Sequence, residues 1–324
     1  MTISTLTQSD IYKYYWIFAQ KRQEIFFSRY NGFDEILIND SILKKYKFTN
    51  TYRASDRVSQ YLIKEIIYKG SQEINELFFR IILFKLFNKI ETWEYLNSIF
   101  PTICLSCFDV EKFSTALSNY RVIGNTVYSA AYIMPSYAGD KRYKEKHISH
   151  LNLLKKMIND DLPQKIANAK SLRDVFNHLL AYPGLGKFLA FQYTIDLNYS
   201  NIINFDENDF VVAGPGAING IRKCFADIGR YSFEDVIKYM VDNQDREFQK
   251  YGLAFKTLWG RDLKLIDCQN IFCEVDKYTR AAFPEYSAIT GRTRIKQQYK
   301  RNLEPIDYFY PPRWGINTKM KREF

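Results

Sequence analysis

The sequence is poor in cysteine and histidine, with 5 Cys and 3 His in 324 residues. Too few cysteines are present for a disulfide framework in a chain of this length, so free thiols in a reducing cytoplasm are expected. Cys104 and Cys107 have the spacing of half a zinc site, but nothing nearby completes it, and buried thiols are favoured. For His147 and His150, in a basic region, a surface position is favoured over metal binding. We therefore expect no metal.

Long apolar runs are also missing. None approaches the roughly 20 residues that span a bilayer, and residues 1–10 lack the basic start and apolar stretch of a signal peptide. The sequence thus predicts a cytoplasmic protein with no membrane association.

Acidic residues are outnumbered by basic ones. Lys and Arg total 46 against 36 Asp and Glu, a net charge of +10. This excess favours a polyanionic partner through phosphate neutralisation and counterion release, although composition leaves DNA, RNA and an anionic membrane open. The 25 Tyr and 25 Phe supply rings for a core and for stacking on bases.

Apolar residues recur at helical spacing, as in 73–87 and 172–180, whereas alternating strand-like runs are scarce. This pattern predicts a mostly α fold. A turn-rich and then basic stretch at 135–146 is the best seam. We expect two helical lobes, 1–140 and 141–324, with a single interlaced domain as the alternative.

Two of the predicted helices are joined by Pro-Gly-Leu-Gly at 183–186. The two glycines permit a tight turn with positive φ, and Leu185 fills the space between the helices. The first N–H groups of the second helix are then suited to hold one DNA phosphate, although an ordinary helical corner is the alternative. The candidate phosphate-binding residues are Gly184, Gly186, Lys187 and Phe188.

Acidic residues follow this hairpin at Asp206 and Asp209. Hairpin and acid together resemble the helix-hairpin-helix DNA glycosylase superfamily, in which a catalytic Asp in a D-x-x-V pattern begins a helix. Asp209 fits that pattern, Asp206 is its near competitor, and each is alternatively only a helix cap. The resemblance implies a helix-hairpin-helix DNA glycosylase-like, two-lobed helical fold.

One carboxylate suffices for the chemistry that this resemblance implies, because it stabilises the positive charge developing on deoxyribose and also activates water. Superfamily members that also nick the strand carry a Lys two residues after the second hairpin glycine, where this chain has Phe188. A monofunctional enzyme that leaves an abasic site is therefore expected.

Segments 48–60, 80–89 and 210–220 resemble a narrower group, the α-glutamyl/putrescinyl thymine pyrophosphorylases, also described as the helical domain of 5-hydroxymethyluracil DNA kinases. The element F-T-N-x-Y-R-A-x-D-R is its most specific part. The resemblance implies action on hypermodified pyrimidines in viral DNA, and relatives include bacterial antiviral glycosylases. The chain has no G-x-x-x-x-G-K-[ST] P-loop, so it is not itself expected to be the kinase.

Polar residues of this element and of later helices are candidate contacts for a base or sugar. Arg53 and Arg57 lie one turn apart on an expected helix, as do Tyr52 and Asp56. Such a ladder is either a buried structural network or a pocket that reads a base edge. The candidate pocket residues are Asn50, Tyr52, Arg53, Asp56, Arg57, Asn88, Gln192, Tyr193 and Asp196. For the last four a structural role is favoured.

Two further segments allow two interpretations each. Gly-Pro-Gly at 214–216 is either a phosphate cradle or, preferably, a tight turn that fixes Asp209. The strongly basic segment 291–324 is a solvated tail or surface helix in one interpretation and a phosphate-contacting arm in the other.

We therefore expect a monomeric DNA glycosylase without a cofactor, which flips a modified pyrimidine out of duplex phage DNA and removes it with Asp209. Glucosylated 5-hydroxymethylcytosine is the preferred substrate, and antiviral defence is favoured over a viral role. A second hypothesis is a base-hypermodification enzyme that displaces pyrophosphate from phosphorylated 5-hydroxymethyl pyrimidines, with Arg53 and Arg57 dominant. A third is a non-catalytic DNA-binding module.

Overall fold

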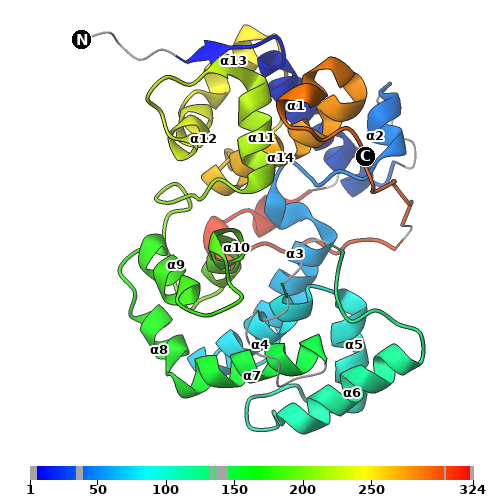
Figure 1. Ribbon diagram of the computed structural model, residues 1–324, viewed down its shortest axis with the longest axis vertical. Helices are drawn as coiled ribbons and strands as arrows, with labels where there is room; N and C mark the ends of the chain where they lie inside the picture. The colour runs from blue at the N-terminus through cyan, green and yellow to red at the C-terminus, as the bar shows by residue number, and fades with distance from the viewer. Residues whose placement is uncertain (1–5, 34–38, 131–134, 136–144, 303, 322–324) are drawn as a thin grey trace. The chain divides into compact units, whose positions relative to one another are not determined.

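The computed structural model describes residues 6–33, 39–130, 135, 145–302 and 304–321. Helices dominate these residues (Figure 1), and the short strands β1 (Thr7–Gln8) and β2 (Phe225–Asp227) pair antiparallel. The predicted mostly α fold is confirmed. Within the described part of the chain, no helix combines the length and the apolar character needed to cross a membrane.

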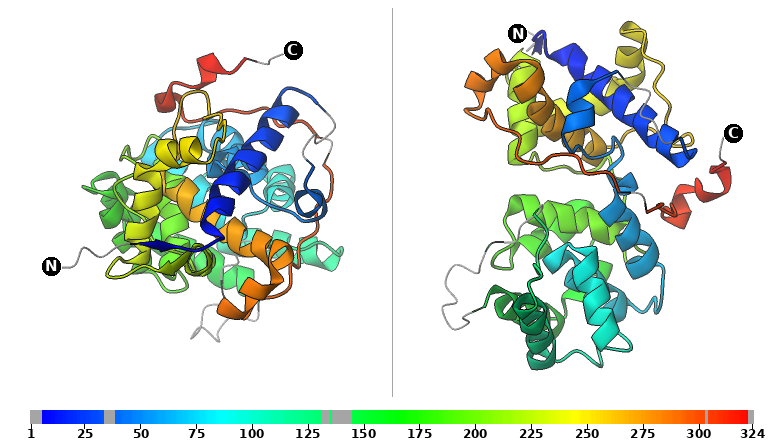
Figure 2. Two further views of the ribbon diagram at one scale, coloured as in Figure 1. Left: turned by 90° about the horizontal axis from the view of Figure 1, so that it is seen from above. Right: turned by 90° about the vertical axis from the view of Figure 1, so that its right-hand side faces the viewer.

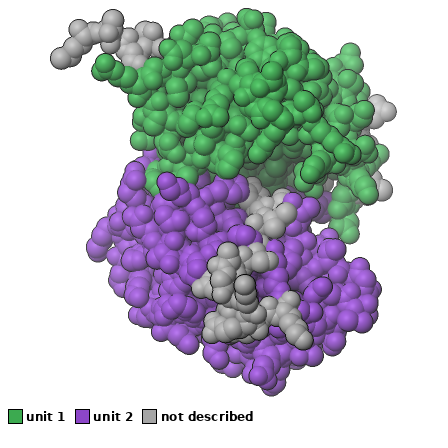
Figure 3. All heavy atoms as spheres, viewed as in Figure 1, with its two compact units in different colours: residues 1–56, 210–324 green, residues 57–209 purple. Residues whose placement is uncertain are grey.

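The chain divides into two compact units (Figure 3), which differ from the expected lobes 1–140 and 141–324. Unit 1 contains residues 1–56 and 210–324, and unit 2 contains residues 57–209. Both ends of the chain share one core, because the first long helix packs against a helix near the C-terminus. The seam expected at 135–146 falls mostly outside the described residues.

Unit 1 is organised around α14 (Leu265–Ala282), which packs against α1 (Tyr12–Tyr30), α11 (Pro215–Cys224) and α12 (Phe233–Asp242) (Figures 1 and 2). An amphipathic pattern places the apolar faces of α11 and α12 against this centre, whereas α1 contributes buried aromatic residues such as Tyr15 and Trp16. The remaining helices of unit 1 are α2 (Ser41–Lys45), η1 (Arg53–Ser55), α13 (Gln244–Lys250), η3 (Pro284–Ile289), η4 (Pro312–Trp314) and η5 (Asn317–Lys319).

The glycines near the start of α11 allow it to approach α14 closely. A Cβ atom at Gly220 would lie 2.1 Å from the carbonyl oxygen of Phe272, and one at Gly216 would lie 2.0 Å from Cys273 Sγ. Gly214 is the N-cap of α11. The glycines at 216 and 220 therefore serve helix packing, which is a different role from the turn around Asp209 that the sequence favoured.

Unit 2 has α4 (Ile74–Phe87) at its centre, and every residue from Leu77 to Phe87 is buried. A helix that is apolar on all sides requires neighbours on all sides, and α7, α8 and α10 are among those that pack on it. The remaining helices are α3 (Arg57–Tyr61), the π-helix η2 (Leu62–Ile67), α5 (Ile90–Ile99), α6 (Val110–Val122), α7 (Lys146–Asn159), α8 (Leu162–Ala167), α9 (Leu172–Leu180) and α10 (Lys187–Asn198).

The predicted hairpin joins α9 to α10. Gly184 has φ of 82°, which favours glycine, and Leu185 is buried between the helices. Gly186 has an ordinary φ of −70° and caps α10 without a side-chain hydrogen bond. The backbone conformation therefore favours glycine only at position 184. Gly186 is exposed, and having no side chain it leaves the N–H groups in the first turn of α10 accessible from outside.

Two predictions about surface and core were wrong. His147 and His150 are buried, and His150 Nδ1 lies 2.8 Å from the Tyr128 hydroxyl, so neither is the expected surface residue. Cys104 is half-buried and Cys107 is exposed, in place of the expected buried pair. Local composition misled here, because Lys146 next to the histidines lies over the Tyr128 ring, whose hydroxyl contacts His150, and does not mark an exposed face of the helix.

We predict that Gly220→Ala lowers the free energy of unfolding by about 3 kcal/mol, because the new methyl group meets the backbone of α14, which cannot move aside. Gly186→Ala is the matched control, since a Cβ there meets nothing within 4 Å. Its cost should stay below about 1 kcal/mol. Urea unfolding of both variants measures the difference, and equal costs would contradict the packing role.

Acid should weaken unit 2 through His150. Burial lowers the pKa of His150 to about 4 in the folded protein, whereas an unfolded histidine titrates near 6.5. The unfolded chain therefore takes up this proton first as the pH falls. The contribution of neutral His150 to the free energy of unfolding is therefore present above about pH 6.5. It should fall by about 2 kcal/mol when the pH is lowered to 5.

The measurement is urea unfolding of the wild type and of His150→Gln at both pH values. The glutamine variant should lose less stability between them than the wild type does. An equal loss in both proteins would assign the acid sensitivity to other groups.

Candidate functional site

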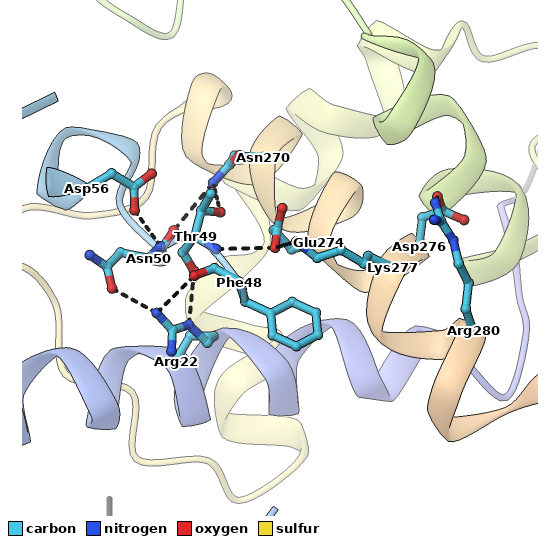
Figure 4. A network of polar contacts seen from close by, with 10 residues as sticks. All are labelled: Arg22, Phe48, Thr49, Asn50, Asp56, Asn270, Glu274, Asp276, Lys277 and Arg280. Atoms are coloured by element: carbon cyan, nitrogen blue, oxygen red, sulfur yellow. Dashed lines mark hydrogen bonds and ion pairs between the residues drawn. The ribbon is translucent and has the colours of Figure 1, made fainter. Parts of the chain in front are cut away.

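A polar cluster in unit 1 surrounds residues 48–56, the segment that carries the specific sequence element (Figure 4). Arg22 points from α1 toward the backbone of this segment. Its Nε donates to the carbonyl oxygen of Thr49 at 2.9 Å, and its Nη2 donates to Asn50 Oδ1 at 3.0 Å. The guanidinium group thereby fixes the segment to α1 through both main chain and side chain.

Asn50 and Asp56 close the segment into a loop. The backbone N–H of Asn50 donates to Asp56 Oδ1 at 2.8 Å, and Asn50 Nδ2 donates to the carbonyl oxygen of Ser55 at 2.8 Å. Ser55 Oγ lies 2.8 Å from the Tyr310 hydroxyl, which comes from the C-terminal segment. The Asp56 carboxylate is therefore held by one hydrogen bond, in a loop that the bonds of Asn50 and Ser55 close.

Helix α14 supports the loop from the other side. Asn270 Nδ2 donates to Thr49 Oγ1 at 2.9 Å, and Glu274 Oε2 accepts from the Thr49 backbone N–H at 3.2 Å (Figure 4). Lys277 Nζ lies 2.7 Å from the same Glu274 oxygen. One turn earlier, Asp267 Oδ1 accepts from the backbone N–H of Arg53 at 2.9 Å.

The electrostatics of the cluster single out Asp56. Burial raises its pKa to about 7, against the opposing effects of its hydrogen bond from Asn50 and of the nearby Arg22. Burial also lowers the pKa of Arg22, and Asp56 partly offsets this. Within the described residues, Asp56 accepts a hydrogen bond through Oδ1 but none through Oδ2. A half-buried carboxyl that titrates near neutrality, with one oxygen available, suits proton transfer.

The structure brings together part of the predicted pocket. Asn50, Tyr52, Arg53 and Asp56 all belong to this loop, but the expected helical ladder through Arg57 was wrong. Residues 53–55 form a short 3-10 turn, Asp56 is extended, and α3 starts only at Arg57, where unit 2 begins. Because Asp56 is extended, Tyr52 and Asp56 do not lie one helical turn apart, and the carboxylate of Asp56 instead accepts a hydrogen bond from the Asn50 backbone N–H.

The other predicted pocket residues form a separate network in unit 2. Lys85 Nζ lies 3.0 Å from Asp196 Oδ2 and donates to Asn88 Oδ1 at 2.7 Å. The Tyr193 hydroxyl donates to the carbonyl oxygen of Lys85 at 2.9 Å, and Gln192 is also buried. The buried Lys85–Asp196 ion pair joins α4 to α10, and Lys85 also has a second partner in Asn88. This supports a structural role for these residues over a role in binding a base.

Asp206 and Asp209 lie in a turn and are exposed. The backbone N–H of Asp209 donates to the Asp206 carbonyl oxygen at 3.1 Å, and Asp206 Oδ1 accepts from the Asn208 N–H at 3.0 Å. The next helix, α11, begins at Pro215. The expectation that Asp209 starts a helix was therefore wrong, because residues 210–214 are extended or irregular.

Arg22, Asn270 and Glu274 were missed by sequence reasoning. Arg22 has no motif around it, and its partners lie on a different segment. A signal was present in α14, where Asp267, Asn270 and Glu274 recur at helical spacing on a buried face. Such a polar stripe in a helix at the centre of a core indicates a buried network.

Comparison with known proteins identifies the family of the chain. The model of the family described as 5-hmdU DNA kinase, helical domain, matches residues 9–288, and the chain belongs to this family. A 5-hmdU DNA kinase of Bacillus phage SP10 is 25% identical over 326 residues, covering 94% of this chain and 50% of the relative. The chain thus spans about half the length of that relative. No solved structure matches significantly.

These findings confirm the narrower resemblance and contradict the glycosylase prediction. The family and the phage relative are named for a kinase, which is a transferase, and neither name describes a hydrolase that removes bases. Excision of glucosylated 5-hydroxymethylcytosine, the abasic-site product and the defence role inferred from it are therefore withdrawn. The catalytic role assigned to Asp209 and Asp206 falls with them.

We predict that Arg22→Met lowers the free energy of unfolding by about 3 kcal/mol, because it leaves two carbonyl oxygens and Asn50 Oδ1 without their cationic donor and Asp56 without a nearby positive charge. Arg29→Met is the matched control on the same helix, since Arg29 is exposed and donates to the Asn302 carbonyl oxygen. Urea unfolding should show less than about 1 kcal/mol for the control. A similar loss of stability in both variants would contradict the conclusion that Arg22 holds the polar loop in place.

Proposed function

We propose that this chain is a DNA base-hypermodification enzyme that acts on 5-hydroxymethyl pyrimidines in DNA after their hydroxyl group has been phosphorylated to a pyrophosphate ester. Membership of a family named for 5-hmdU DNA kinases supports the substrate class. The chain corresponds to half of the kinase relative and contains no P-loop. We therefore assign phosphorylation itself to a different polypeptide segment.

The observation that carries the proposal is Asp56, a carboxyl with a pKa of about 7 in a rigid polar loop. In the proposed step an amine attacks the methylene carbon of the base. The bond from that carbon to the pyrophosphate oxygen breaks, and pyrophosphate leaves with the electron pair. The ionised form of Asp56 accepts the proton that the amine loses.

Cationic groups are needed beside the leaving pyrophosphate. Arg53 and Arg57 flank this part of the loop in the sequence, and we assign them to that role. Arg53 is buried whereas Arg57 is half-buried, so Arg57 is the better phosphate ligand of the two. Asn50 positions Asp56 through its backbone N–H.

Duplex DNA is the proposed partner, and the hairpin of unit 2 is one proposed contact. Helix α10 starts at Lys187, has no side-chain cap, and presents exposed residues at Gly186 and Lys187. An uncapped helix N-terminus favours an anion such as a DNA phosphate. The net charge of +10 supports the same partner.

The proposal is tested on duplex DNA that carries pyrophosphorylated 5-hydroxymethyluracil, with amine donors added. Release of pyrophosphate and the mass of the modified nucleoside are measured. Asp56→Asn should lower the rate at least about 100-fold, because the amide cannot accept the proton. Asp245→Asn, which changes an exposed carboxylate of the same unit, should leave the rate unchanged.

Two outcomes of this experiment would overturn the proposal. One is full activity of Asp56→Asn. The other is transfer of labelled γ-phosphate from ATP to 5-hydroxymethyluracil DNA by this chain alone, which would place the phosphorylation step here.

The rate should also rise with pH through the pKa of Asp56, which is about 7. The carboxylate is the proton acceptor, so the protonated form that prevails at lower pH is inactive. Because Arg22 favours the ionised form, Arg22→Lys should move the midpoint less than Arg22→Met, which should move it upward. A pH profile with no inflection between about pH 6 and 8 would exclude Asp56 as the base.

A further inference from the structure

The C-terminal segment of unit 1 is paired with a segment near the N-terminus. The Lys47 backbone N–H donates to the Gln297 carbonyl oxygen at 3.1 Å, and the Tyr299 N–H donates to the Lys45 carbonyl oxygen at 3.0 Å. Tyr46 and Gln298 form an antiparallel bridge between them. We call residues 44–47 and 292–301 the basic ribbon. It is neither the solvated tail nor the surface helix that the sequence allowed.

The ribbon gathers positive charge from both of its segments. Neither segment contains Asp or Glu. Its exposed cationic residues are Lys44, Lys45, Lys47, Arg292, Arg294, Lys296, Lys300 and Arg301. The clustering is invisible in the sequence, because the fold brings the two groups of cations together from opposite ends of the chain.

Such clustering costs stability in the isolated protein. Like charges gathered on one surface repel each other. Neutral polar side chains at the same positions would avoid this repulsion. A polyanion that binds the ribbon relieves it and releases its own counterions, which makes binding favourable.

The ribbon adjoins the polar cluster around Asp56. Phe48 and Thr49, whose carbonyl oxygens accept from Arg22, follow Lys47 directly in the chain. On the other segment, Tyr299 lies close enough to Arg22 to oppose the lowering of its pKa by burial. A polyanion bound to the ribbon therefore lies next to the candidate site.

We propose that the basic ribbon binds the sugar-phosphate backbone of duplex DNA and delivers it to the Asp56 cluster. The ribbon's less polar residues, Tyr46, Ile295 and Tyr299, are all half-buried, so it exposes no apolar wedge of the kind that enters a membrane. This favours nucleic acid over a lipid surface. The family match ends at residue 288, so the second segment of the ribbon lies beyond it. Delivery to the cluster rests on the proposed function, whereas phosphate binding does not.

The test compares two variants of equal net charge. The ribbon variant carries Lys45→Gln, Lys47→Gln, Lys296→Gln and Lys300→Gln. The control carries Lys112→Gln, Lys155→Gln, Lys170→Gln and Lys238→Gln, which are exposed lysines outside the ribbon. Circular dichroism and urea unfolding verify that both fold like the wild type.

Binding to an unmodified duplex is measured by fluorescence anisotropy over a range of salt concentrations. The ribbon variant should bind at least about tenfold more weakly near 0.1 M salt, and its log–log salt slope should shrink by up to about 3.6, because each of the four lost phosphate contacts removes roughly 0.9. The control should keep the wild-type slope. An equal loss of DNA affinity in both variants, or no loss in the ribbon variant, would refute the proposal that the ribbon binds DNA.

Vesicles containing phosphatidylserine provide a second arm. Loss of vesicle binding with DNA binding retained would assign the ribbon to a membrane and overturn the proposal. Failure of the proposed function has a different signature, since DNA without a modified base still reports ribbon binding. If the protein never turns over pyrophosphorylated DNA but the ribbon variant binds DNA weakly, DNA binding by the ribbon is supported and the proposed chemistry is refuted.

Discussion

The close contact between α11 and α14 sets the position of most of unit 1. Gly220 has no room for a side chain against the backbone of Phe272, and the buried Lys223 Nζ lies 2.9 Å from Asp276 Oδ1 a turn further along. An ion pair with both side chains removed from water tolerates little displacement, because separation leaves two charges uncompensated. The helix that is fixed in this way on one side presents Asn270 and Glu274 on another. The polar loop thus receives its geometry from a contact that contains none of its own residues.

The loop combines groups whose charges would be costly alone. Desolvation disfavours both the Asp56 carboxylate and the Arg22 guanidinium, and each reduces the penalty on the other. The result is a carboxyl whose pKa burial raises to about 7, while the hydrogen bond from Asn50 and the charge of Arg22 limit the rise. A fully solvated Asp would be ionised at neutral pH, and one without a cation would stay protonated. The environment, more than the residue type, makes Asp56 suitable for proton transfer.

Much of the helical structure was predictable, because the spacing of apolar residues reports local conformation. The hairpin at Gly184 was predictable for the same reason. The glycosylase function was inferred from that hairpin and from Asp209, two features that each arise readily in helical proteins, whereas the longer element around Asn50 and Asp56 pointed to the correct family. The polar stripe in α14 that contains Glu274 indicated a buried network, but the contacts of Glu274 and Arg22 with that element were not predictable. Those contacts depend on which distant helices meet, and no local pattern encodes that.

The division of the chain has a consequence for how the protein is made. Unit 1 needs both ends of the polypeptide, as shown by the Tyr15 hydroxyl, which donates to the Cys268 carbonyl oxygen 253 residues later. On the ribosome, residues 57–209 emerge as a continuous segment and can pack first, while α1 waits for α14. Contacts so distant in sequence also slow folding in general, because a long loop must close before they form. The loop around Asp56 therefore takes shape only after α14 has been synthesised, and a chain that lacks α14 would carry the family's most specific sequence element without the helix that shapes it.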